Sequence, residues 1–167
     1  MSARILVAYA SVRGSTAEIA KAVGEKLKSA GHSVDVREIV TVSSIIDYDA
    51  VVIGGPLYMG KLAGGIGRFV EKNRDALAKV PVAAFAVGIA PVSKNPGDLE
   101  SAMKMLRTGL GPIEPVAATV FAGVVDPAKL SFVQRWMIKK VKTPVGDFRD
   151  WDVIARWARE LPGKMGM

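Results

Sequence analysis

The chain has no cysteine and one histidine among its 167 residues. Without cysteine it cannot form disulfides, thiolate metal sites, iron–sulfur clusters or a cysteine nucleophile. The lone histidine, His32, removes most zinc and haem sites as well. Any redox chemistry must therefore be carried by an organic cofactor.

Long apolar runs are also missing. No run reaches the roughly 20 residues that span a bilayer, and the N-terminal residues do not form the long apolar segment of a signal peptide. We therefore expect a cytoplasmic protein. Half of the residues are nevertheless hydrophobic, which is enough to bury one core, so one domain over residues 1–167 is expected.

Acidic residues are fewer than basic ones. The chain has 16 Asp and Glu against 23 Lys and Arg, giving a net charge of +7. This excess favours an anionic partner, substrate or surface. The basic residues are spread along the chain without a recognition motif, so nucleic acid is not an expected partner.

Apolar patterning predicts alternating strands and helices. Continuous apolar runs predict strands buried on both faces, whereas alternation around Val34 and Val36 predicts an edge strand. The buried strands are expected at residues 5–9, 50–53, 82–87 and 116–122. Since parallel neighbours need helical crossovers, the order predicts an α/β fold with a doubly wound, mainly parallel sheet covered on both faces.

Boundary signals predict where the helices start and stop. Ser15 and Glu18 fit a capping box, so the first helix should begin directly at the turn that follows the first strand. Asp98 is expected to cap a later helix, and Pro162 to end the last one.

The turn after the first strand is suited to a phosphate. It offers hydroxyls, successive backbone N–H groups, a glycine and a helix N-terminus, all of which favour an anion. Helix capping alone also explains such a turn. Neither a Walker pattern nor G-x-G-x-x-G follows the strand, which disfavours nucleoside triphosphates and dinucleotides. The predicted phosphate residues are Ser11, Val12, Arg13, Gly14, Ser15 and Thr16.

Glycine- and proline-containing loops follow the next two buried strands. Ligands of doubly wound sheets lie beyond the carboxyl ends of the strands. Glycine lets the backbone approach a flat ligand, and Tyr58 offers an aromatic face. An ordinary turn with Tyr58 packed on the protein would have the same sequence. With the phosphate turn, these loops predict a slot for a planar ring. Its expected lining residues are Pro56, Leu57, Tyr58, Met59, Gly60, Gly88, Ile89, Ala90 and Pro91.

The first turn carries a family resemblance. The strand followed by Ser11, Gly14 and Thr16 resembles the FMN-phosphate loop of flavodoxins. Within that superfamily the chain looks most like the menaquinone-dependent protoporphyrinogen dehydrogenase group. The features that suggest it are residues 54–60 running on to Phe69 and Val70, the strand with Phe85, residues 132–140, and Asp150 and Trp151 with residues 155–160.

The resemblance implies a flavodoxin-like five-stranded parallel sheet of order 2-1-3-4-5 that binds FMN. The phosphate would lie on residues 11–16 and the isoalloxazine between residues 56–60 and 88–91. Two functions remain open: an electron carrier, whose partner is another redox protein, or an FMN-dependent oxidoreductase acting on a porphyrinogen or a quinone. Residues 54–61 and 88–96 contain no acid, which favours two-electron reduction because the reduced flavin is an anion.

Other reaction classes lack their residues. A phospho-acceptor receiver needs an aspartate at the end of the third strand, where the chain has Ile53 and Gly54. Serine hydrolysis needs a nearby histidine, and His32 is expected at the opposite end of the sheet. No general acid or base for a substrate is identified.

Residues 127–146 are basic and contain no acid. Apolar residues at helical spacing predict a basic amphipathic insertion before the last helix, suited to peripheral contact with the inner face of an anionic membrane. The alternative is that Trp136 and Met137 pack on the domain. The predicted contact residues are Lys129, Arg135, Trp136, Lys139, Lys140 and Lys142.

Overall fold

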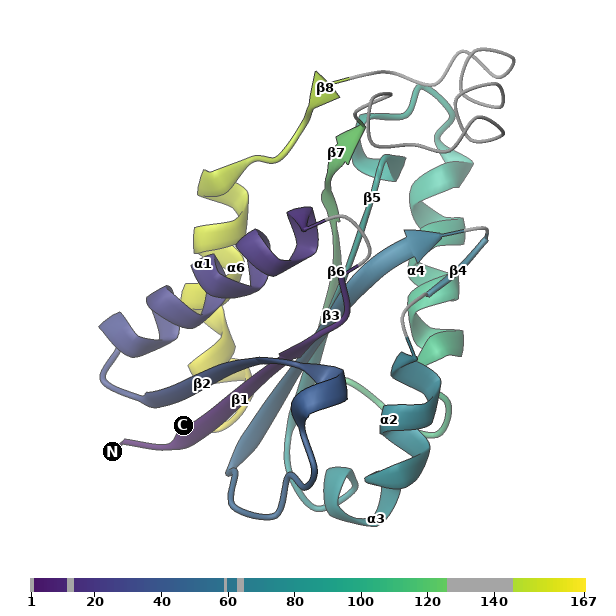
Figure 1. Ribbon diagram of the computed structural model, residues 1–167. Coiled ribbons are helices and arrows are strands. Elements are labelled where there is room, and N and C mark those ends of the chain that lie inside the picture. Colours follow the sequence, from purple (N-terminus) through teal and green to yellow (C-terminus); the bar gives the residue numbers. More distant parts are fainter. Residues whose placement is uncertain (1, 12–13, 59, 63–64, 126–145) are drawn as a thin grey trace.

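A parallel sheet forms the centre of the computed structural model, which describes residues 2–11, 14–58, 60–62, 65–125 and 146–167 (Figure 1). Its strands are β1 (Arg4–Tyr9), β2 (Ser33–Glu38), β3 (Ala50–Tyr58), β5 (Val82–Gly88) and β6 (Ala117–Ala122). They are arranged β2-β1-β3-β5-β6 and every pair among them is parallel. Counted along the chain, this is the predicted order 2-1-3-4-5.

Three shorter strands extend this sheet or lie beside it. β4 (Lys61–Leu62) pairs antiparallel with the end of β3 and so forms a hairpin. β7 (Val124–Val125) pairs antiparallel with β8 (Gly146–Asp147), in a separate two-stranded sheet. Neither of these two antiparallel pairings is predicted by the sequence patterns.

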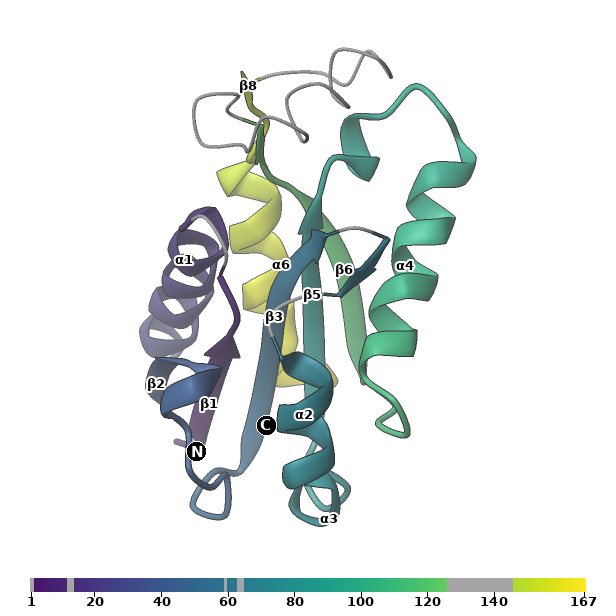
Figure 2. The same ribbon diagram turned by 45° about the vertical axis from the view of Figure 1, so that its right-hand side comes forward.

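Helices cover both faces of the sheet, as Figures 1 and 2 show. One face carries α1 (Ser15–Ser29) and α6 (Trp151–Lys164); the other carries α2 (Ile66–Lys72), α3 (Arg74–Leu77) and α4 (Gly97–Gly109). Two single-turn 3-10 helices, η1 (Ile39–Thr41) and η2 (Ala90–Val92), follow β2 and β5. Each face therefore has its own hydrophobic core, as expected for a doubly wound sheet.

Burial explains the strand patterns. Ile5, Leu6, Val7 and Ala8 of β1 are all fully buried because β1 has a neighbour on each side and helices on both faces. β2 is an edge strand with a partly exposed face, as its alternation predicts. On the α1 and α6 side, the rings of Phe85, Phe121 and Trp157 contact one another in tilted and edge-on arrangements.

The third strand is longer than predicted. It passes through Gly54, Gly55 and Pro56 and ends at Tyr58. A Cβ on Gly54 would lie 2.1 Å from Cζ of Phe85, and one on Gly55 would lie 2.3 Å from Cδ1 of Ile66. These glycines therefore make room for core side chains within the strand. Pro56 is tolerated because the ladder with β1 ends at Gly54, so no partner needs its missing N–H.

The first helix begins directly at the turn, at Ser15, as predicted, but two predicted helix caps and one predicted helix end are wrong. α1 has Gly14 as its N-cap and no side-chain cap, and Glu18 pairs with Arg149 instead of completing a capping box with Ser15. α4 starts before Asp98, whose carboxylate accepts a hydrogen bond from the Ser93 hydroxyl. α6 continues through Pro162 to Lys164, since a proline in the last turn costs few helical bonds.

Candidate functional site

The three predicted loops lie at one edge of the sheet. β1, β3 and β5 are adjacent and parallel, with Tyr9 paired to Gly54 and Pro56 paired to Val87. Their carboxyl ends therefore point the same way, toward the upper edge in Figure 1. His32 precedes β2 and lies at the opposite end, as predicted.

Gly14 shapes the turn after β1. Its φ of 90° is in the left-handed region, which a side chain disfavours, although no atom lies within 4 Å of where its Cβ would be. The N–H of Gly14 donates to Oγ of Ser11 at 2.9 Å and closes the turn. Val12 and Arg13, also predicted here, lie outside the described residues.

The first turn of α1 has backbone N–H groups that donate to no carbonyl within the helix. The first helical bond runs from N–H of Glu18 to the carbonyl of Gly14 at 3.3 Å. The N–H groups of Ser15, Thr16 and Ala17 thus have no intrahelical acceptor, and the N-cap residue, Gly14, has no side chain that could cap them. With the positive end of the helix dipole, they favour an anion. Thr16 is buried in the same turn.

The predicted lining residues Pro56, Leu57, Tyr58 and Gly88 belong to the ends of strands β3 and β5 rather than to loops after them. The half-buried side chain of Leu57 packs on the core, and its Cδ1 lies 3.5 Å from the Cβ position of Gly88. The side chain of Leu57 therefore lies beside the last residue of β5. Tyr58, at 39% exposure, presents a ring at the end of β3, and Gly60 turns the chain into β4 with a φ of 79°. Met59 lies outside the described residues.

The loop after β5 is more ordered than a simple turn. Ala90 and Pro91 belong to η2, with Ile89 as the residue that precedes it. Ala90 packs on the core while Pro91 is exposed. The structure thus brings the described members of all three predicted loops to one edge, with Tyr58 as the exposed aromatic residue among them.

Arg149 forms an ionic cluster beside α1 that the sequence patterns do not predict. Its guanidinium donates to Oε2 of Glu18 at 2.7 Å and, through Nε and Nη2, to both carboxylate oxygens of Asp147 at 3.0 and 2.8 Å. It also lies 4.9 Å from the centre of the Trp151 ring. The hydrogen bonds from Arg149 lower the pKa of Asp147. Glu18 and Arg149 are 131 positions apart, so no local pattern links them.

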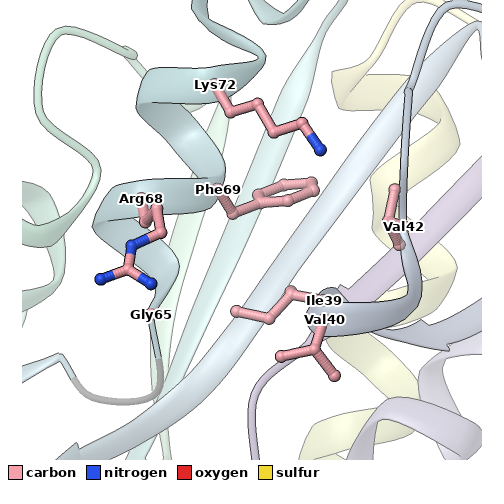
Figure 3. A pocket seen from close by; sticks show the side chains of 7 residues that line it. All are labelled: Ile39, Val40, Val42, Gly65, Arg68, Phe69 and Lys72. Carbon is pink, nitrogen blue, oxygen red and sulfur yellow. The ribbon is translucent and has the colours of Figure 1, made fainter.

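A small pocket of about 200 Å³ lies away from these loops, between η1 and α2 (Figure 3). Ile39 and Val40 lie across from Phe69, and Lys72 and Arg68 come from the same helix as Phe69. It contains no predicted site residue, so it has no part in the predicted slot.

Two classes of site have no support among the described residues. No group of three or more His, Asp or Glu side chains that could hold a metal ion occurs there. No helix in the described part of the chain has both the length and the apolar character to cross a membrane. The predicted basic insertion, residues 127–146, lies outside the described residues apart from Gly146 in β8.

Comparison with known proteins decides the family. The model of the flavodoxin domain family matches residues 6–152. The chain belongs to the flavodoxin domain family. Flavodoxins bind FMN, so the predicted cofactor is confirmed at the level of the family.

The similar proteins cover very different fractions of this chain. Protoporphyrinogen IX dehydrogenase [quinone] of Escherichia coli K12 is 26% identical, over 95% of this chain and 94% of its own length. An NAD(P)H dehydrogenase (quinone) of Acidovorax ebreus is 28% identical over 41% of this chain and 46% of its own. A flavodoxin structure from Streptococcus pneumoniae, 20% identical, superposes with a TM-score of 0.60 over 97% and 99% of the two chains, and confirms the fold.

Proposed function

We propose that this flavodoxin domain is an FMN-dependent oxidoreductase that dehydrogenates a porphyrinogen and passes the electrons to a quinone. The observation that carries the proposal is the end-to-end similarity to the E. coli protoporphyrinogen IX dehydrogenase [quinone], which covers 95% of this chain and 94% of the relative. Each two-electron step takes two hydrogens from the porphyrinogen and reduces one quinone to the quinol.

The turn after β1 fits the phosphate of FMN. The N–H groups of Ser15 and Thr16 precede the first intrahelical bond and lie beside the left-handed Gly14 at the positive end of α1. Ser11 holds this turn in shape through its bond to Gly14. We assign the phosphate to Ser11, Val12, Arg13, Gly14, Ser15 and Thr16.

The two neighbouring loops fit the ring. Tyr58, an aromatic residue, is 39% exposed at the end of β3, and the side chain of Leu57 lies beside Gly88 at the end of β5. We assign the ring to residues 56–60 and 88–91. When bound, FMN supplies the chemistry of accepting and returning two electrons. The side chains around it bind and orient the ring and exclude water.

Charge near the ring favours an enzyme over a carrier. Residues 54–61 and 88–96 contain Lys61 and Lys94 and no acid. Nearby cations stabilise an anionic reduced flavin, and nearby carboxylates would oppose it. The second candidate, an electron carrier whose partner is another redox protein, is favoured by the similarity of the whole fold to the S. pneumoniae flavodoxin.

Anaerobic turnover tests the proposal. Purified protein reconstituted with FMN is mixed with protoporphyrinogen IX and menadione, and porphyrin fluorescence is followed. We expect porphyrin to form only with FMN-loaded protein and quinone together, with FMN-free protein as the control. If loaded protein forms no porphyrin above background and dithionite titration shows a long-lived semiquinone, the carrier function is correct instead.

We further propose that residues 127–146 hold this cytoplasmic enzyme on the inner face of an anionic membrane. The support is their sequence: five basic residues and no acid. Sedimentation with vesicles of anionic and of neutral lipid tests this on the variant K139Q/K140Q/K142Q. We expect wild type to sediment with anionic vesicles only and the variant to sediment less. Equal sedimentation of both proteins would refute the contact.

A further inference from the structure

A groove of about 560 Å³ runs between β4 and α4, on the sheet face opposite α1. Its volume is within the range of sites that bury small organic ligands. The β4 hairpin that forms one wall has no sequence signal, so the groove is missed from sequence alone. The side chains that line it are Lys61, Leu62, Ser101, Lys104, Met105 and Thr108.

The α4 wall is a single stripe of the helix. Ser101, Lys104, Met105 and Thr108 are spaced three, four and seven positions apart and so share one side. Ala102 and Leu106, on a neighbouring side, are the buried residues that hold α4 on the sheet. The stripe facing the groove is therefore separate from the packing contacts of α4.

The groove is positively charged. Lys61 and Lys104 line it from opposite walls, and its lining contains no acid. Neither lysine takes part in an ion pair among the described residues. Two cations without a carboxylate partner attract an anionic group, and Ser101 and Thr108 add hydroxyl donors.

Two of the lining residues are apolar. Leu62 and Met105 are half-buried there. A Cβ on Gly109 would lie 2.7 Å from Cβ of Leu62, so β4 packs directly against the end of α4. Methionine adapts to irregular apolar surfaces. A ligand of this groove would therefore combine an apolar body with negative charge.

One end of the groove adjoins the proposed flavin loops. Gly60 lines it and lies in the turn that joins β3 to β4, two positions after Tyr58, which the proposal places against the ring. We propose that this groove binds the porphyrinogen substrate, with the macrocycle on Leu62 and Met105 and the propionate carboxylates on Lys61 and Lys104. This inference rests on the proposed function.

Charge variants of the holoprotein test the groove. For K61Q/K104Q we expect a KM for protoporphyrinogen IX about tenfold higher, as expected for the loss of two solvent-exposed ion pairs. Lys104 lies in α4, outside the proposed ring loops, so K104Q alone should raise the KM about threefold and leave the kcat, the FMN affinity and the KM for uncharged menadione unchanged. The matched control is K26Q/K79Q, which removes the same charge from exposed lysines that do not line the groove.

A binding titration separates failure of the groove from failure of the proposed function. Protoporphyrin IX and its dimethyl ester are titrated by fluorescence against wild type and K61Q/K104Q. We expect the diacid to bind wild type about tenfold more tightly than the variant, and the ester to bind both alike. Turnover by wild type with an unchanged KM in the variant would overturn the groove alone. If wild type does not turn over, equal affinity of wild type for diacid and ester overturns the groove as well.

Discussion

Arg149 bonds Glu18 of α1 at 2.7 Å from a side chain that is only 11% exposed. The same guanidinium holds Asp147 of β8 in a two-pronged bond. The first helix, which begins at the proposed phosphate turn, is thereby fastened to the chain just after residues 126–145. A single cation thus links two segments that the sequence separates by most of its length.

Replacing Arg149 with methionine should lower the free energy of unfolding by roughly 1 to 2 kcal/mol, because charge-assisted bonds of a mostly buried donor are lost while Glu18 stays solvated. Urea unfolding followed by circular dichroism measures this. Lys164→Met, which breaks the exposed pair with Glu160, is the control and should cost less than about 0.5 kcal/mol. Equal losses in the two variants would contradict a stabilising role for Arg149.

The lowered pKa of Asp147 predicts an acid-sensitive contribution to stability. A carboxyl whose pKa is lower in the folded state stabilises the fold above its unfolded pKa, near 3.9, and loses that effect as the pH falls through the folded pKa. The stability difference between wild type and Asp147→Asn should therefore be constant above about pH 5 and shrink below about pH 4. Urea midpoints from pH 2 to 7 measure it. A constant difference over that range would show that the pairing does not shift the pKa.

Gly14→Ala should destabilise the protein by about 1 to 2 kcal/mol, because alanine is strained at a φ of 90°. It should also weaken FMN binding, since the left-handed conformation of Gly14 positions the N–H groups that we assign to the phosphate. Thermal unfolding and calorimetric FMN titration measure the two effects. Gly163→Ala in α6 is the matched control: its φ is not positive and its Cβ position is open, so it should be neutral or slightly stabilising. If both alanines behaved alike, the left-handed turn would not matter.

Gly54→Ala should cost about 3 kcal/mol or more, since the new Cβ would meet the Phe85 ring at 2.1 Å. Phe85→Leu removes the ring atoms involved, and in the double variant the cost of Gly54→Ala should fall by at least half. Urea unfolding of the four proteins in this cycle gives the coupling. Additive losses would mean that Gly54 is needed for another reason.

Sequence patterns were sufficient where burial alone decides structure. The apolar run from Ile5 to Ala8 and the alternation at Val34 reflect a central and an edge strand, and the order of elements then places the loops at one edge. The patterns failed where a residue far away in the sequence determines the role of a side chain or of a glycine. From sequence, Gly54 has the appearance of a loop glycine, but in the structure it lies in a strand against the ring of Phe85. Likewise, Glu18 has the spacing of a capping residue, but its carboxylate binds Arg149. The lysines of the groove face each other only because β4 folds back beside α4, which no local signal predicts.

The pairing of β7 with β8 sets Val125 directly across from Gly146. Antiparallel residues so paired can be joined by a two-residue turn such as Asn-Gly. Residues 126–145 can therefore be deleted and the two strands joined by such a turn, and the shortened chain would reveal which properties of the protein depend on those residues.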